Sequence, residues 1–257
     1  MKSNSMSAGR VAVVRRPGPR LIEGLTETGL AEPVDPDRAA SQWQAYVDAF
    51  ATAGWNIVEC PPADDCPDAV FVEDPVVVFD RTAVVTRPGA PSRRPETAAI
   101  APLFSELGLD VVSLTEGTLD GGDVLKVGNV AYVGLSDRTN EIAVANLAEV
   151  LGEEWKVVGV RLSGVLHLKS AITALPDGEL IGLADNVDAQ VVSRVREMPE
   201  AEGAHVVEIA PNHLLMSASA PESVRLLKGE GYKITAVDIS EFEKLDGCVT
   251  CLSVRIR

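Results

Sequence analysis

The amino-acid sequence predicts an α/β protein made of five successive units of about 45 residues, repeated around an axis with the helices outside. Segments typical of β-hairpins recur along the chain, and most are followed by a helix-like segment and one further strand. Polar or reactive residues beside apolar strands recur with the same spacing. The first and last β-like segments, 11–16 and 250–257, can complete one sheet, which would close the ring and remove its free edges.

The elements expected for the first three units follow a similar order. Each contains strands around a helix whose apolar residues recur at helical spacing, and such a helix packs outside a sheet. The expected elements are a strand at 11–16, a helix at 37–54 and a strand at 55–61; a hairpin at 76–87, a helix at 94–108 and a strand at 109–114; and a hairpin at 123–134 with a Gly-Asn turn, a helix at 139–152 and a strand at 155–162.

The last two units repeat the pattern less regularly. We expect a hairpin at 170–184 with an Asp-Gly turn, a helix at 188–198 and a strand at 204–210, then a strand at 213–218, a helix at 221–232, a strand at 233–239 and the terminal strand. The alternative fold is a doubly wound sheet. Such a sheet is mostly parallel, so the abundant hairpins favour the five-fold arrangement.

Composition narrows the classes of function. The chain has 38 acidic and 23 basic residues and a formal net charge of −15, and an acidic surface repels nucleic acid. It has no apolar run approaching the ~18 residues of a membrane helix. Residues 1–9 are polar and predict a disordered tail, whereas 10–257 predict a single domain. With four cysteines and no export signal, we expect free thiols and a cytoplasmic protein.

Five residues stand at equivalent points of the five units. They are Asp74, Asp120, His167, Asn212 and Cys251, each beside an apolar strand. Equivalent positions in a ring point toward its axis, so carboxylates, an imidazole and a thiol are expected to converge there. Taken singly, each has a plainer explanation: a lone histidine is more often a satisfied polar residue, and Asp120 before Gly-Gly can be a turn former.

Two further groups of residues have open alternatives. Glu73 and Asp74 can be a solvated pair, but the valines around them indicate burial, which is costly unless a cation such as a substrate pairs with them. Arg93 and Arg138 are either surface charges or a clamp for a substrate carboxylate.

The histidine and cysteine spacings give no support for a metal site. No two of the three histidines are spaced as HExxH or HxxxH. Cys248 and Cys251 match C-x-x-C, but no helix is expected to follow, so we favour a single nucleophilic Cys251 over a redox or zinc pair. Cys248 precedes the expected strand, so it need not share the site.

The motifs together resemble one known family. PDAVFVEDPVVV, TRPGAPSRRPE, TLDGGDVL, VGLSDRTN, VLHLKS and LDGCVTCLSVRI are similar, in order and over nearly the whole chain, to those of dimethylarginine dimethylaminohydrolases. The resemblance implies a five-bladed α/β propeller that hydrolyses Nω-methylated arginines to citrulline and methylamine or dimethylamine. It implies no metal or organic cofactor, and a homodimer is conceivable because such rings can pair through outer edges.

The resemblance also implies roles for individual residues. Cys251 would be the nucleophile and His167 the general acid and base, with Asp120 as the acid beside the histidine. The expected substrate contacts are Leu25 in a lid segment, Asp68, Glu73, Asp74, Arg93, Arg138 and the backbone carbonyl of Leu245. Cys248 departs from the apolar or Gly residue expected at its position.

Three alternatives remain at this point. An arginine deiminase uses the same kind of nucleophile but is typically longer, with an added helical region. An agmatine deiminase would leave two candidate carboxylate-binding arginines without a purpose. A binding protein that senses methylarginines without catalysis would not need the cysteine, histidine and acid that this sequence retains.

Overall fold

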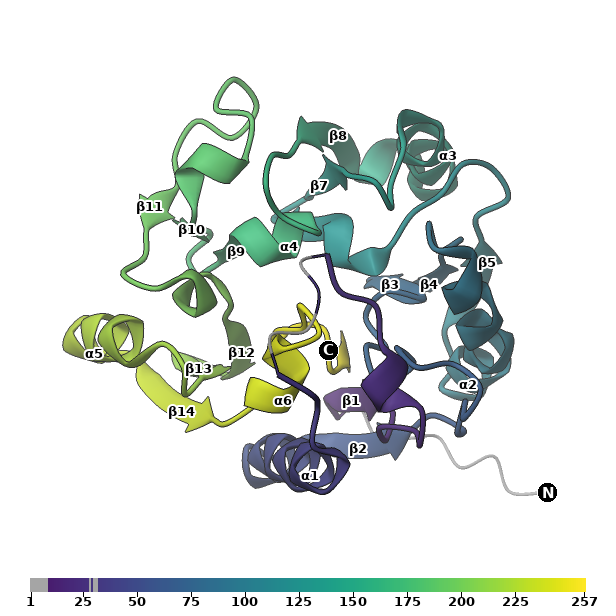
Figure 1. Cartoon of the computed structure of the whole chain (residues 1–257). Coiled ribbons are helices and arrows are strands. Elements are labelled where there is room, and N and C mark those ends of the chain that lie inside the picture. Colours follow the sequence, from purple (N-terminus) through teal and green to yellow (C-terminus); the bar gives the residue numbers. More distant parts are fainter. Residues whose placement is uncertain (1–8, 28, 30–31) are drawn as a thin grey trace.

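The computed structural model describes residues 9–27, 29 and 32–257. Most of the expected N-terminal tail, residues 1–8, lies outside the described residues. Within the described chain, five three-stranded sheets surround a common centre, and the chain passes through them in order around the ring (Figure 1). The five-unit α/β fold predicted from the sequence is therefore confirmed.

The fifteen strands are short because each spans only one small sheet. Their bounds are β1 Val11–Val14, β2 Asn56–Glu59, β3 Val76–Phe79, β4 Thr82–Val85, β5 Asp110–Ser113, β6 Val124–Val127, β7 Val130–Leu135, β8 Lys156–Arg161, β9 Ile172–Ala174, β10 Leu180–Gly182, β11 Arg196–Glu197, β12 Val207–Ala210, β13 His213–Ser217, β14 Lys233–Val237 and β15 Val254–Ile256.

Every sheet uses the same pairing. Its middle strand is antiparallel to one neighbour and parallel to the other, as in the orders β3-β4-β5, β6-β7-β8, β9-β10-β11 and β12-β13-β14. In the remaining sheet, β15-β1-β2, the last strand pairs antiparallel with the first, with Val11 opposite Ile256. The two ends of the described chain therefore complete one sheet and close the ring, as expected.

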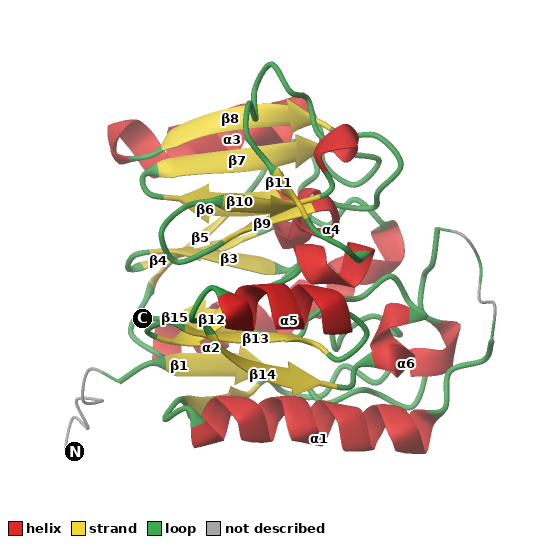
Figure 2. Ribbon diagram, turned by 90° about the vertical axis from the view of Figure 1, so that its left-hand side faces the viewer, coloured by secondary structure: helices red, strands yellow, loops and turns green. Residues whose placement is uncertain are grey.

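The longer helices cover the outside of the ring, whereas two helices of four residues, Leu168–Ala171 and Ser240–Glu243, lie nearer its centre (Figure 1). The longest, α1, covers the sheet that contains β1 and β2, and Asp35 caps its N-terminus by accepting hydrogen bonds from the backbone N–H groups of Asp37 and Arg38 (Figures 1 and 2). The α-helices are α1 Pro36–Thr52, α2 Ile100–Glu106, α3 Glu141–Leu151, α4 Leu168–Ala171, α5 Pro221–Gly229 and α6 Ser240–Glu243. Short 3-10 helices span Leu21–Glu23, Pro91–Ala99, Gly121–Asp123, Gly152–Glu154, Ala184–Asn186 and Ala201–Ala204.

Two expected helices differ from the structure. The helix expected at 94–108 is split into a 3-10 helix and α2, because Pro95 lies inside it and has no N–H to donate. No helix forms at 188–198. That segment is rich in valine, which disfavours a helix, and its residues Arg196 and Glu197 instead form β11 beside β10. The strand expected to end the fourth unit pairs with β13 and belongs to the fifth sheet.

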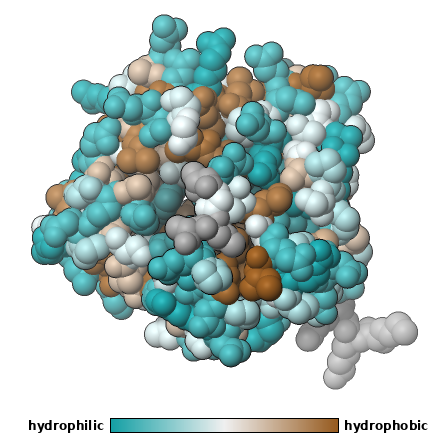
Figure 3. Space-filling view, viewed as in Figure 1, coloured by the Kyte–Doolittle hydropathy of each residue, from teal (hydrophilic) through white to brown (hydrophobic). Residues whose placement is uncertain are grey.

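Apolar side chains form separate clusters around the ring rather than one central core. The cluster under α1 holds Trp43, Tyr46 and Phe50, and the cluster beneath α2 holds Ile100 and Phe104. The centre is thereby left for polar side chains. No helix among the described residues combines the length and apolar character that a bilayer-spanning helix requires. The face seen in Figure 3 is mainly hydrophilic, with hydrophobic residues gathered near its middle.

Candidate active site

A nearly closed cavity lies where several units meet. Its volume is about 20 Å³, which holds about one water molecule. Its lining includes Asp74 before β3, His167 at the start of α4 and Cys251 in the turn before β15. The other lining residues are Leu25, Thr26, Asp68, Phe71, Arg93, Arg138, Leu166, Leu245, Asp246 and Gly247. The fold thus brings together side chains that are nearly two hundred residues apart in the chain.

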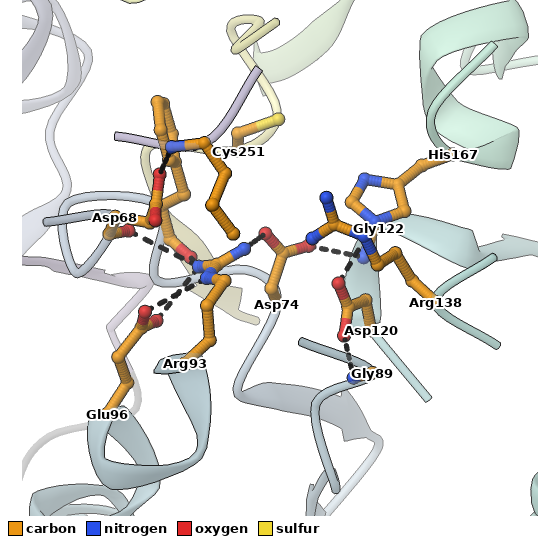
Figure 4. A network of polar contacts seen from close by, with 12 residues as sticks. Asp68, Asp74, Gly89, Arg93, Glu96, Asp120, Gly122, Arg138, His167 and Cys251 are labelled. Atoms are coloured by element: carbon orange, nitrogen blue, oxygen red, sulfur yellow. Dashed lines mark hydrogen bonds and ion pairs between the residues drawn. The ribbon is translucent and has the colours of Figure 1, made fainter. Parts of the chain in front are cut away.

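Asp74 is held at the centre of a polar network (Figure 4). One carboxylate oxygen, Oδ2, lies 2.5 Å from Arg93 Nη1, and the other, Oδ1, accepts a 2.9 Å hydrogen bond from the backbone N–H of Gly122. Burial alone would raise the pKa of Asp74, but Arg93, His167 and the Gly122 N–H favour the carboxylate and together lower it. Asp74 is therefore an anion at neutral pH.

His167 and Asp120 form a buried pair. The imidazole Nε2 lies 3.1 Å from Asp120 Oδ2, while Asp120 Oδ1 accepts a 2.9 Å hydrogen bond from the N–H of Gly89. Burial alone would lower the pKa of His167, but the carboxylates of Asp123, Asp74 and Asp120 outweigh it and raise the pKa to about 9. The imidazole is therefore protonated at neutral pH and can donate a proton.

The two glycines after Asp120 allow this close approach. A side chain on Gly122 would place its Cβ 2.6 Å from His167 Nδ1 and 2.8 Å from Asp74 Oδ1. A Cβ on Gly121 would lie 2.0 Å from the backbone oxygen of Glu73. All three distances are shorter than real Cβ contacts, so the sequence Gly-Gly is a packing requirement of the site.

Cys251 does not lie in the expected strand. β15 starts at Val254, and residues 248–251 form a turn in which the Cys251 N–H donates to the Cys248 carbonyl oxygen at 3.1 Å. The turn places the two sulfurs 3.2 Å apart, and the Cys248 N–H points to Cys251 Sγ at 3.4 Å. The two sulfurs are in contact because the backbone turns where the sequence suggested an extended chain, although Cys248 stays outside the lining of the cavity.

The surroundings of Cys251 disfavour ionisation of its thiol. Its hydrogen bond with Cys248, its burial and the nearby carboxylates of Glu73 and Asp74 all raise the pKa of Cys251 well above its usual value. The same sulfur–sulfur hydrogen bond lowers the pKa of Cys248 despite burial. The two sulfurs thus lose a first proton readily and a second one with difficulty.

Arg93 and Arg138 occupy different environments. Arg93 is buried, and beside its ion pair with Asp74 it donates from Nε and Nη2 to Glu96 at 2.9 and 2.8 Å. Arg138 lies nearer the surface, and its Nη2 is 3.1 Å from Glu27 Oε1. Both line the cavity, but Arg93 is saturated by protein partners, so only Arg138 has the character of an accessible clamp.

The segment around Leu25 lies over the cavity. The Leu25 N–H donates to Asp68 Oδ1 at 2.9 Å, and the Glu27 N–H donates to Asp246 Oδ2 at 2.7 Å. With the Arg138–Glu27 ion pair, these contacts hold the segment against the ring. Leu245 lies beneath it, buried, at the end of the turn that follows α6.

Glu73 points away from this cavity. Its Oε1 lies 2.6 Å from Lys169 Nζ and 2.9 Å from Arg255 Nη2, in a second cavity of about 330 Å³ that Lys126 and Arg257 also line. The sequence suggested that a bound substrate supplies the cation for Glu73 and Asp74. In the structure both carboxylates have cationic partners within the protein: Lys169 and Arg255 pair with Glu73, and Arg93 pairs with Asp74. A role of Glu73 in substrate binding stays a prediction.

Asn212 does not join the central residues. It is exposed in the tight turn between β12 and β13, with a φ of 55° that asparagine tolerates better than most residues. Its position in the repeat is therefore explained by hairpin geometry. Of the five phased residues, the other four meet at the cavity or directly beside it.

The chain is similar over nearly its whole length to known enzymes. Residues 26–249 match the family model described as "N,N dimethylarginine dimethylhydrolase, eukaryotic". An N(G),N(G)-dimethylarginine dimethylaminohydrolase from Streptomyces coelicolor is 53% identical over 96% of both chains. The protein of the same name from Pseudomonas aeruginosa is 36% identical over 95% of this chain and 98% of its own.

The chain belongs to the dimethylarginine dimethylaminohydrolase family.

Solved structures agree with this assignment. A cysteine-to-serine variant of the Pseudomonas aeruginosa family member, in complex with citrulline, superposes with a TM-score of 0.88 at 33% identity and covers 96% of this chain and 99% of its own. The N-terminal domain of a cyanobacterial arginine dihydrolase shares the fold, with a TM-score of 0.82 at 20% identity. An arginine deiminase from Listeria welshimeri is 26% identical, and the match covers 74% of this chain and 62% of the deiminase.

Two residues of the candidate site, Asp123 and Glu96, escaped the sequence analysis. Asp123 accepts hydrogen bonds from the Leu168 N–H at 2.9 Å and from the Ser136 hydroxyl at 2.7 Å, and it raises the pKa of His167. Glu96 is the buried partner of Arg93. Asp123 belongs to the same LDGGD motif as Asp120 and could have been considered. Glu96 stands three residues after Arg93, a spacing that permits an ion pair, and could have been considered with it.

The carboxylates and imidazole also meet a geometric condition for a cation site. Ligand atoms of Asp74, Asp120 and His167 lie within 4.8 Å of one another. Their contacts, however, are already made inside the protein: Arg93 and the Gly122 N–H occupy Asp74, and Asp120 occupies Nε2 of His167. In this structure the three side chains are therefore joined to protein partners by ion pairs and hydrogen bonds.

Proposed function

We propose that this protein hydrolyses Nω-methylated arginines, asymmetric dimethylarginine and monomethylarginine, to citrulline and dimethylamine or methylamine. The observation that carries the proposal is the meeting of one thiol, one protonated imidazole and one buried carboxylate at a single cavity, formed by Cys251, His167 and Asp74. Membership of the family supplies the substrate class. The geometry of the site indicates a role in the reaction for each of these side chains.

Substrate binding depends on the positive charge of the guanidinium group. A guanidinium carbon is a poor electrophile because its positive charge is spread over three nitrogens. The carboxylate of Asp74, fixed by Arg93 and the Gly122 N–H, offers a hydrogen-bond acceptor that localises this charge and orients the guanidinium plane. Arg138 then offers a guanidinium for the carboxylate at the amino acid end of the substrate, and Asp68 offers a carboxylate for the ammonium group.

The first chemical step transfers the carbon to sulfur. Once the guanidinium is bound beside it, the Cys251 thiol releases its proton to solvent, and the resulting thiolate attacks the guanidinium carbon and forms a C–S bond. His167 gives its proton to the methylated nitrogen, the C–N bond breaks, and dimethylamine or methylamine leaves. An S-alkylthiouronium remains on Cys251. The proton is available because the carboxylates around His167 raise its pKa to about 9.

The second step restores the enzyme. Deprotonated His167 accepts a proton from water, whose oxygen attacks the same carbon and forms a C–O bond. The C–S bond then breaks, and citrulline leaves as the sulfur regains a proton. Asp120 acts through His167: its hydrogen bond to Nε2 orients the ring and stabilises the imidazolium form.

Substrate entry needs movement of the lid segment. A cavity of about 20 Å³ has no room for an arginine derivative. The contacts of Leu25 with Asp68 and of Glu27 with Arg138 and Asp246 must therefore open, and they use the same side chains that the substrate would engage.

The remaining properties belong to the same proposal. Residues 10–257 act as a single catalytic unit in the cytoplasm on a small-molecule substrate, without a metal or organic cofactor. Nucleic acid and membranes are not partners, which accords with the net charge of −15. Two copies can pair through the outer edges of the ring as a homodimer.

The test is a comparison of substrates. Purified protein is incubated with asymmetric dimethylarginine, monomethylarginine, arginine and agmatine, and the ureido products and released amines are quantified. We expect turnover of the two methylated arginines and none in the Cys251→Ser variant. Faster turnover of arginine would assign a deiminase, faster turnover of agmatine an agmatine deiminase. Tight binding of methylarginine without turnover would indicate a binding protein.

A further inference from the structure

The two C-terminal cysteines lie closer together than catalysis by a single thiol requires. Cys248 Sγ and Cys251 Sγ are 3.2 Å apart, and both residues are more than nine-tenths buried. All four cysteines of the chain are free, and among the described residues no other two cysteine sulfurs contact each other. Cys248 lies outside the lining of the cavity, so the proposed reaction gives it no part.

The backbone turn holds the two cysteines at a separation close to that of a disulfide. The hydrogen bond from the Cys251 N–H to the Cys248 carbonyl closes a four-residue turn, which brings the two Cα atoms within about 7 Å. Natural disulfides span Cα separations up to about 6.8 Å. The sulfurs need to approach by only about 1 Å to reach a bond length of about 2.05 Å. Rotation of the two side chains can supply this without unfolding the turn.

We propose that Cys248 and Cys251 form a reversible intramolecular disulfide when the protein meets a peroxide, and that this bond blocks the nucleophile. Cys251 reacts first because it lines the cavity that a small oxidant can enter. In the resting contact the anion is favoured on Cys248 and the proton on Cys251. Transfer of this proton across the sulfur–sulfur contact to Cys248 produces the Cys251 thiolate that reacts with the peroxide.

The reaction balances with one peroxide and two thiols. The Cys251 thiolate attacks a peroxide oxygen, an S–O bond forms, the O–O bond breaks, and the departing hydroxide takes a proton to become water. Cys248, deprotonated, then attacks the Cys251 sulfur; the S–S bond forms, the S–O bond breaks, and the second hydroxide leaves as water. Both sulfurs are oxidised by one electron each, and the peroxide is reduced to two waters.

The neighbours of Cys248 favour this second step. Its sulfur lies 3.2 Å from the Thr250 hydroxyl, which can donate to a thiolate at that position. The hydrogen bond to Cys251 lowers the pKa of Cys248. A thiolate that is already in contact captures the oxidised sulfur before a second peroxide does. Intracellular disulfides are in general transient and redox-sensing, and this one would be of that kind.

The test compares four proteins treated with hydrogen peroxide and then with dithiothreitol: wild type, Cys248→Ser, Cys60→Ser and Cys66→Ser. Trypsin cleavage after Lys244 and Arg255 releases residues 245–255, which contain both cysteines. In wild type we expect this peptide to lose the mass of two hydrogens and to regain it with dithiothreitol. Activity, expressed relative to each protein's own starting rate, is lost and recovered in parallel. The Cys60 and Cys66 variants should behave like wild type.

The Cys248→Ser variant separates a disulfide from simple oxidation of the nucleophile. Without Cys248, we expect the peptide to gain two oxygens at Cys251 and the lost activity not to return. A Cys248→Ala variant, checked by circular dichroism, repeats the test if the serine variant is poorly folded. The proposal would be overturned if the wild-type peptide gained oxygens irreversibly, as is expected for the Cys248 variants. The mass readout needs no substrate, so the outcome is independent of the proposed function.

Discussion

His167 Nε2 lies 3.1 Å from Asp120 Oδ2, and both residues are almost completely buried. A buried imidazole would ordinarily be neutral at pH 7, because burial disfavours its charged form. The surrounding carboxylates reverse this and raise the pKa of His167 to about 9. The pair therefore supplies a proton where the proposed chemistry needs one.

The first prediction concerns the pH dependence of turnover. Asp120→Asn removes one of the charges that raise the pKa of His167, so the alkaline limb of the pH profile should move to lower pH by about one unit or more. The measurement is kcat against pH for wild type, Asp120→Asn and a control, Asp110→Asn, whose carboxylate is exposed at the start of β5. An alkaline limb that stays in place would remove Asp120 from this role.

The second prediction concerns stability. The folded pKa of His167, about 9, lies above its unfolded value of about 6.5, so protonation stabilises the folded state. This contribution is complete below about pH 6.5 and is lost as the pH rises toward 9, with an upper size of about 3 kcal/mol. Urea unfolding of wild type across that window should show a fall in the free energy of unfolding that His167→Gln lacks. Parallel curves for the two proteins would contradict the prediction.

The third prediction concerns the glycine that contacts the histidine. A methyl group at Gly122 would overlap His167 and Asp74, so Gly122→Ala must displace the imidazole. Misplacement of a catalytic group by about 1 Å can cost about 100-fold in rate, and we expect a loss of that order in kcat. Gly229→Ala is the matched control, because a Cβ there meets open space. If both variants were equally active, the site would accommodate the added methyl group and the prediction would be wrong.

The fourth prediction separates the two arginines. Arg138→Ala should chiefly raise KM, by the equivalent of about 1–3 kcal/mol, with little change in thermal stability. Arg93→Ala should in addition destabilise the fold by about 3–5 kcal/mol, since it leaves Asp74 and Glu96 buried without their cation. Kinetics and thermal melts would be compared with Arg81→Ala, at an exposed turn. A fully stable Arg93→Ala variant would contradict this assignment.

The fifth prediction concerns when the nucleophile ionises. Burial and the carboxylates of Glu73 and Asp74 raise the pKa of Cys251, so the free enzyme should hold a neutral thiol that ionises once a guanidinium binds beside it. In a Cys248→Ser background, alkylation of Cys251 by a neutral reagent should be slow near about pH 7 and rise at alkaline pH. A small non-reactive amidinium ligand should shift that rise to lower pH.

The control for this titration is the thiolate absorbance near 240 nm, with the Cys248→Ser, Cys251→Ser double variant subtracted as background. A thiolate already complete at about pH 6 in the free enzyme would instead indicate a preformed ion pair of Cys251 with His167.

The sequence by itself determined the repeat and much of the site. Hairpins and helices follow from local periodicity and turn residues, so the five units and the closure of β15 onto β1 were predictable. Equivalent positions in a ring face its axis, and this symmetry correctly singled out Asp74, Asp120 and His167 as neighbours. Cys251 followed from the same spacing and from the family resemblance.

Only the tertiary structure decided how these groups are paired. Spacing could not reveal that Arg93 is saturated by Asp74 and Glu96, or that Lys169 and Arg255 hold Glu73 away from the cavity. The pairs of Glu73 with Lys169 and Arg255 join residues from different units. Asp74, Arg93 and Glu96 belong to one unit, but their burial, which makes the pairing obligatory, does not follow from spacing alone. The contact of Cys248 with Cys251 depends on a backbone turn where the alternation of residues suggested a strand. The periodicity of a sequence predicts which face of a strand or helix a residue occupies. Which side chains it contacts depends on how the units pack against one another, and this packing is a property of the whole folded chain.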